Sequence, residues 1–227
     1  VEAQIRSLGA NLMMVFSASP TFTGARSAAG ATHTVSEDDA YAIALELPEH
    51  VAGAAPALRG SGQIVAGNSN WSTSFYGVTP DYFAVREWEL AEGRFFAPAE
   101  INGAAKVAII GKTVATNLFG DASPIDQTLR IRTVPLTVVG VLAGKCQSPG
   151  GSDLDDVLLM PITTARNRVL GATALAKSRS VGSIQIKLHD GADSKAAEAR
   201  VRELLRQRHR LQPDQDECFS CSGGLTV

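Results

Sequence analysis

The sequence contains no uninterrupted apolar run of roughly 18 residues, the length that a bilayer-crossing helix needs. It has only three cysteines, and this small, odd number does not build a disulfide framework. It also lacks a long basic run, and its net charge is −2, so the charge pattern of a nucleic-acid-binding surface is missing. We therefore expect no membrane span within this segment, no disulfide-stapled fold and no nucleic-acid partner.

The motifs of common catalytic sites are missing as well. The four histidines are scattered, and none belongs to a His-Glu-x-x-His pair. There is no Gly-x-Ser-x-Gly elbow, and no pattern supplies a nucleophile, a base and an oxyanion donor together. We expect the segment not to be an enzyme, and to carry no catalytic residue, cofactor-binding residue or metal ligand.

Two short patterns resemble ligand sites only superficially. Gly111-Lys112-Thr113 lacks the glycine that a P-loop has five residues earlier, where Lys106 stands, so we expect an ordinary strand-to-helix turn. The aspartates at 153, 155 and 156 lack the glycine and glutamate of a calcium loop, because Leu158 and Thr164 hold those positions. We expect a solvated loop that enters a strand.

The cysteines give no clear site. If the stretch from Cys218 to Cys221 is extended, its two α-carbons lie about 10 Å apart, which is too far for a disulfide. A zinc site would need more ligands than His209, the one histidine nearby. We expect no redox pair here and assign no role to Cys146.

The sequence around Gly93-Arg94-Phe95-Phe96 allows two interpretations. Exposed aromatic residues and arginine are typical of binding hot spots. A pair of phenylalanines after a turn is more commonly one core residue and one peripheral contact, and we favour that interpretation.

Local signals predict an α+β fold. Hydrophobic residues make up 44% of the chain and charged residues 19%, which is a globular composition. Helices and strands alternate irregularly, which favours α+β over a doubly wound sheet. The helices are predicted at 36–47, from 79, at 111–119, 162–170 and 196–210, and the strands at 62–67, 71–78, 106–110, 129–133, 136–142, 157–160, 183–189 and near 218–221.

The helix at 36–47 has the clearest start signal. Ser36 can cap it, and Asp39, three residues later, completes a capping-box pattern. We place the apolar residues on its inner face: Tyr41, Ile43, Ala44 and Leu47. In the helix at 196–210, Ala197, Val201, Leu204, Leu205 and Arg208 fall on one side.

The beginning of the chain indicates a piece of a longer protein. It has no initiator methionine or leader and runs directly into apolar residues. Ile5, Leu8 and Leu12 have helical spacing, and Leu12–Val15 continues as a buried strand.

An ordered string of segments covers nearly the whole chain: 35–40, 51–56, 76–82, 93–96, 107–111, 117–120, 138–142, 155–157 with Pro161, and 204–210. No single motif among them is specific, but the string resembles the periplasmic domain of MacB-type ABC transporter permeases, in the family's order. In that family a membrane helix precedes this domain, so the resemblance implies that Ile5, Leu8 and Leu12 form a membrane-proximal stalk. The final residues, 216–224, depart from the family's usual ending, and we assign them no function.

The resemblance implies a two-lobed architecture. A porter-like α/β lobe is expected from both chain ends, at 1–78 and 181–227, and a mixed α+β lobe from 79–180. It also implies an extracytoplasmic domain of an inner-membrane protein that couples cytoplasmic ATP hydrolysis to efflux by mechanotransmission. The implied partners are the membrane helices and nucleotide-binding domain of the same transporter, a second copy in a homodimer, and a periplasmic adaptor with an outer-membrane duct.

Two alternatives stay open at this point. A free-standing periplasmic ligand-binding protein would have a leader upstream, whereas a transporter would have a membrane-length apolar run there. A lipoprotein-releasing permease domain shares the architecture, and would differ by a lipoprotein-gripping loop.

Overall fold

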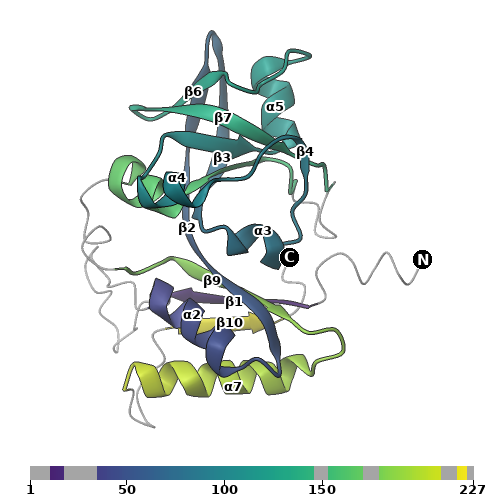
Figure 1. Ribbon diagram of the computed structural model, residues 1–227, viewed down its shortest axis with the longest axis vertical. Coiled ribbons are helices and arrows are strands. Elements are labelled where there is room, and N and C mark those ends of the chain that lie inside the picture. The colour runs from purple at the N-terminus through teal and green to yellow at the C-terminus, as the bar shows by residue number, and fades with distance from the viewer. Residues whose placement is uncertain (1–10, 18–34, 146–152, 171–178, 211–218, 224–227) are drawn as a thin grey trace, which may run out of the picture. The chain divides into compact units, whose positions relative to one another are not determined.

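The computed structural model describes residues 11–17, 35–145, 153–170, 179–210 and 219–223 (Figure 1). These residues form two compact units. Unit 1 holds 11–17, 35–57, 84–86, 179–210 and 219–223, and unit 2 holds 58–83, 87–145 and 153–170. Strand β2 (Val51–Ala66) contributes its first half to unit 1 and its second half to unit 2.

Unit 1 is an antiparallel sheet with two helices. Its strands lie in the order β10 (Phe219–Gly223), β1 (Leu12–Ser17), β9 (Ser183–Leu188) and β2. Helix α2 (Glu37–Glu46) contacts α7 (Ser194–Arg208), which also contacts β10. The core between them is formed by side chains that are all at most 3% exposed: Met13, Val15, Ile43, Leu47, Ile184, Ile186, Val201 and Leu205.

Unit 2 is a mixed sheet in the order β2, β3 (Ser69–Val78), β8 (Val157–Pro161), β5 (Val107–Ile110), β7 (Val134–Leu142) and β4 (Leu90–Gly93). Strand β6 (Thr128–Ile131) pairs with both β2 and β7. The pairs β3–β8 and β5–β7 are parallel. The helical segments are α3 (Asp81–Val85), which both units share, α4 (Pro98–Asn102), α5 (Lys112–Phe119), α6 (Ile162–Thr164) and the π-helix η1 (Ala165–Val169).

The predicted boundary after residue 78 differs from the division into the two compact units. Residues 58–78 belong to unit 2, because β3 pairs in parallel with β8 from Ser74 opposite Val157 to Val78 opposite Pro161. The predicted strand at 62–67 is also too short, since β2 begins at Val51 and pairs with β9 in unit 1. The first half of β2 is rich in alanine and glycine, so its pairing outweighs its weak strand propensity.

Local signals were more reliable within single elements. The capping box is confirmed, because Ser36 Oγ accepts from the Asp39 amide (3.2 Å) and Asp39 Oδ2 accepts from the Ser36 amide (2.9 Å). The prediction that Tyr41 lies on the inner face of this helix was wrong. Tyr41 is 47% exposed, on the outer side of α2 with Leu45, while Ala40 and Ala42 are buried in its place.

The strands predicted at 129–133 and 136–142 form an antiparallel hairpin, as β6 and β7. Strand β7 begins earlier than predicted, at Val134, and its Pro135 lies opposite Arg130. The bend is formed by Arg132, which has φ of 53°, and Thr133. No helix among the described ranges is both long and apolar enough to cross a membrane.

Candidate functional site

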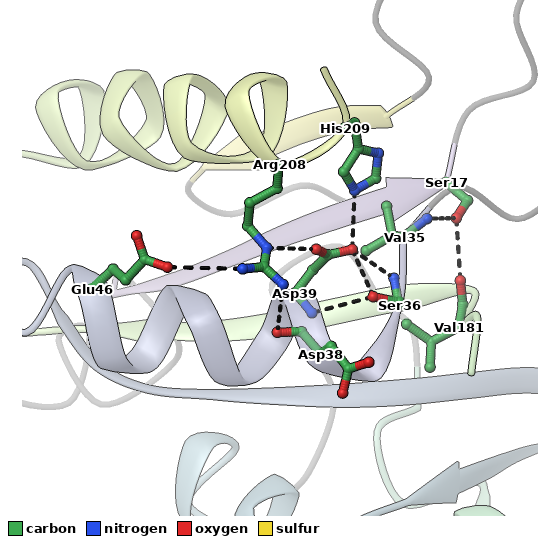
Figure 2. A network of polar contacts seen from close by, with 9 residues as sticks. All are labelled: Ser17, Val35, Ser36, Asp38, Asp39, Glu46, Val181, Arg208 and His209. Carbon is green, nitrogen blue, oxygen red and sulfur yellow. Dashed lines mark hydrogen bonds and ion pairs between the residues drawn. The ribbon is translucent and has the colours of Figure 1, made fainter. Parts of the chain in front are cut away.

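A cluster of polar contacts in unit 1 is centred on Asp39, in the first turn of α2 (Figure 2). Its side chain is 5% exposed. Oδ2 accepts from the Ser36 amide (2.9 Å) and the Ser36 hydroxyl (2.8 Å). Arg208 Nε donates to Oδ1 at 2.9 Å, and His209 Nε2 donates to Oδ2 at 3.0 Å. We call Ser36, Asp39, Arg208 and His209 the Asp39 cluster.

The surroundings of Asp39 favour its charged form. Burial alone would raise its pKa, because desolvation penalises the carboxylate. The hydrogen bonds from His209, Arg208 and Ser36 outweigh burial and hold the pKa of Asp39 well below its ordinary value. The cluster therefore contains a fixed negative charge between the start of α2 and the end of α7.

This shift predicts an acid-sensitive contribution to stability. Because the pKa of Asp39 is lower in the folded than in the unfolded chain, its stabilisation is complete above about pH 4 and is lost as pH falls further. Hydrogen exchange of the α2 amides between pH 7 and pH 3 measures this loss. Asp39→Asn should flatten the dependence of α2 protection on pH, and an unchanged dependence in that variant would assign the acid sensitivity elsewhere.

Two of the three predicted stalk residues, Ile5 and Leu8, lie outside the described residues. Leu12 is the first residue of β1, is half-buried and pairs with Lys187 of β9. The predicted strand that begins at Leu12 is confirmed, with Met13 and Val15 fully buried. The role of the three residues as a stalk stays a prediction.

The Gly-Lys-Thr pattern forms the predicted strand-to-helix turn. Gly111 is the N-cap of α5, and a β-carbon there would lie 2.1 Å from the Asp155 carbonyl oxygen. Thr113 Oγ1 donates to Asp153 at 2.7 Å. Lys112 is exposed at the first position of the helix.

The three aspartates are used for hydrogen bonds inside unit 2, so the prediction of a solvated loop was incomplete. Asp155 accepts from the Lys145 amide (2.8 Å), Asp153 from the Asp155 amide (2.8 Å), and Asp156 from the indole N–H of Trp71 (2.9 Å). Within the part of the chain that the structure describes, no group of three His, Cys, Asp or Glu side chains is arranged to hold a metal ion.

The phenylalanine pair divides as the favoured interpretation predicted. Phe96 is 5% exposed and Phe95 is 41% exposed, and both rings contact Phe83, at centroid distances of 5.7 and 4.6 Å. Arg94 forms a two-pronged ion pair with Glu100, with both N–O distances 2.7 Å. Hydrogen bonding within this pair lowers the pKa of Glu100 and raises that of Arg94.

Of the cysteines, Cys146 and Cys218 lie outside the described residues. Cys221 is half-buried in β10, opposite Val15 of β1. The final strand predicted near 218–221 is confirmed as β10, although the structure does not test the Cys218–Cys221 spacing.

The chain has the predicted α+β fold. Its first and last described strands, β1 and β10, are neighbours in one sheet. A family model for the MacB-like periplasmic core domain matches residues 1–204. The chain belongs to this family.

Relatives of known sequence support the assignment. The chain is 37% identical over 222 residues to the macrolide export ATP-binding/permease protein MacB of Chlorobaculum tepidum, covering 97% of this chain and 33% of that protein. The MacB of Bdellovibrio bacteriovorus is 35% identical over 211 residues, covering 93% of this chain and 31% of that protein. The chain thus spans about a third of the length of these curated relatives.

Solved structures share the fold. The periplasmic region of MacB from Actinobacillus actinomycetemcomitans superposes with a TM-score of 0.71 at 24% identity, covering 96% of this chain and 91% of that one. The extracellular domain of the noncanonic ABC-type transporter YknZ from Gram-positive bacteria gives a TM-score of 0.67 at 16% identity, covering 93% and 100%.

Proposed function

We propose that the chain is the extracytoplasmic part of an ABC transporter permease that exports its substrate from the periplasm. In this proposal, ATP hydrolysis inside the cell changes the conformation of the periplasmic domains of a homodimer. A periplasmic adaptor and an outer-membrane duct then receive the substrate. Membership of the MacB-like family and the relatives' description as macrolide export ATP-binding/permease proteins support the proposal.

The observation that carries the proposal is the pairing of β1 with β10. The strands are antiparallel, with Met13 opposite Gly223 and Ser17 opposite Phe219. The chain therefore enters β1 at the same end of the sheet at which it leaves β10. One membrane helix before β1 and another after β10 would consequently meet the same bilayer surface, as a permease with an inserted periplasmic domain requires.

We assign the porter-like role to unit 1 and the role of the inserted lobe to unit 2. Unit 1 contains the two strands next to the proposed membrane attachments, β1 and β10. Unit 2 falls between these two strands in the sequence, and residues 84–86, which belong to unit 1, interrupt it. Movement of the membrane helices would therefore reach unit 1 first.

The stalk makes a direct prediction about transport. Leu8→Asp or Leu12→Asp in the full-length transporter should reduce macrolide export at least tenfold, while ATP hydrolysis persists in part. The reason is that a charge would separate the stalk from the lobe that it moves, leaving the ATPase uncoupled. Export from cells and ATP hydrolysis by purified transporter are measured together.

The matched control is Leu45→Asp, which places the same charge on α2 at a leucine that is 81% exposed. It should leave export unchanged. A thermal melt of the 227-residue chain separates uncoupling from unfolding. Equal export by the stalk variants and the wild type would contradict the stalk.

A second experiment tests whether ATP hydrolysis belongs to a part of the full-length protein outside these 227 residues. The 227-residue chain alone should not hydrolyse ATP above a buffer control, whereas the full-length protein should. ATP hydrolysis by the isolated chain, reproducible between preparations, would overturn the proposal.

A further inference from the structure

The segment that enters α2 lies between the end of β1 and the residues that precede β9 (Figure 2). Ser17, the last residue of β1, accepts a hydrogen bond from the Val35 amide at 3.3 Å and donates one to the Val181 carbonyl at 3.1 Å. The Val181 amide donates back to the Val35 carbonyl at 2.8 Å. Val35 and Val181 are fully buried, so these bonds are shielded from water.

The same segment continues directly into the Asp39 cluster. Ser36 follows Val35 and donates both its amide and its hydroxyl to Asp39. On the other side of the carboxylate, Arg208 and His209 belong to the end of α7, the helix that precedes β10 in the chain. Polar contacts thus run without a break from the end of β1, through the first turn of α2, to the end of α7.

Such a continuous set of polar contacts restricts relative movement in a way that apolar packing does not. A buried ion pair adds little net stability over apolar side chains of the same volume, but removing one partner is costly. A carboxylate that accepts from four donors fixes the arrangement of all of them, whereas apolar surfaces can slide over one another.

We propose that the Asp39 cluster is a latch that makes the end of β1, the first turn of α2 and the end of α7 move as one body. A displacement of β1 then reaches the helix that leads to β10. The coupling is a property of unit 1 itself, and only its use in transport rests on the proposed function.

A double-mutant cycle on the 227-residue chain tests the latch. The variants are Ser17→Ala, Arg208→Gln and the two combined. The readout is the hydrogen-exchange protection of the Leu47 amide, which donates to the Ile43 carbonyl at 3.2 Å at the end of α2. We expect the combined loss of protection to differ from the product of the two single losses by about threefold or more.

The control replaces Arg208→Gln with Arg200→Gln on the same helix. Arg200 pairs with Glu203 on the exposed side of α7, at 2.7 Å. Its effect and that of Ser17→Ala should multiply within about twofold, as for independent sites. The milder Arg208→Lys replaces Arg208→Gln if the latter unfolds unit 1. If the losses of protection caused by Ser17→Ala and Arg208→Gln also multiply as for independent sites, the latch is overturned.

A transport measurement then tests its use. Asp39→Asn in the full-length transporter should lower export about tenfold with ATP hydrolysis retained, and Asp38→Asn should leave export unchanged. If the wild-type protein exports nothing, the proposed function fails while the cycle still decides the latch. If export by Asp39→Asn equals that of the wild type, the latch has no role in transport and that part of the inference is overturned.

Discussion

Replacing Gly111 with valine is expected to lower the free energy of unfolding of unit 2 by about 3 kcal/mol. A β-carbon at this position would lie 2.1 Å from the Asp155 carbonyl oxygen and 2.8 Å from its carbonyl carbon. Both atoms belong to the backbone, so the contact is relieved only by moving β5 away from the segment that enters β8. The Gly111 amide donates to the Val157 carbonyl at 2.9 Å, and this bond would be lost as the chains separate.

Urea unfolding followed by tryptophan fluorescence measures this loss, because both tryptophans of the chain, Trp71 and Trp88, lie in unit 2. The neighbouring substitution Lys112→Ala is the control. Lys112 is exposed, so its removal should change the free energy of unfolding by less than about 0.5 kcal/mol. An unchanged free energy of unfolding in the Gly111→Val variant would show that β5 and the start of β8 do not lie this close.

Removing the buried carboxylate of Asp39 is the second change with a large expected effect. Asp39→Ala should lower the free energy of unfolding of unit 1 by about 3 to 5 kcal/mol. The substitution leaves the Arg208 and His209 donors and the Ser36 amide without their acceptor. It also removes the side chain that completes the capping box of α2.

The control for this change is the adjacent Asp38→Ala. Asp38 is 53% exposed and pairs with Arg179, itself 64% exposed, at 2.9 Å. Its loss should cost less than about 1 kcal/mol, because solvent screens exposed ion pairs. Hydrogen exchange of the α2 and α7 amides compares the two variants, and equal losses of protection would mean that burial of the Asp39 carboxylate carries no special weight.

The parts of the fold that sequence predicts well depend on neighbours in the chain. The capping box of α2 needs only Ser36 and Asp39, and the end of α5 needs only Gly120, which has φ of 60°. The buried face of β3 follows from period-two alternation, with Thr73 and Phe75 inside. Ala197, Val201, Leu204 and Leu205 are buried along α7, as helical spacing predicts.

The parts that sequence predicts poorly depend on residues far apart. Arg208 was placed on one side of its helix with the apolar residues, but its partner Asp39 is 169 positions away, and no local pattern connects them. Tyr41 was placed on the inner face because it is apolar, whereas the smaller Ala40 and Ala42 take the buried positions of α2. The division between the units depends on the parallel pairing of β3 with β8, which strand propensities do not specify.

Both ends of the described chain lie together in one sheet, and we propose that two membrane helices carry the domain there. Spin labels on cysteines introduced at positions 11 and 223, with every native cysteine changed to serine, test this arrangement in the full-length protein. Because β1 and β10 are neighbouring strands, we predict strong dipolar broadening, from a label separation below about 20 Å. Spectra without dipolar broadening would place the ends apart and contradict the two-helix attachment, and with it the proposed transporter.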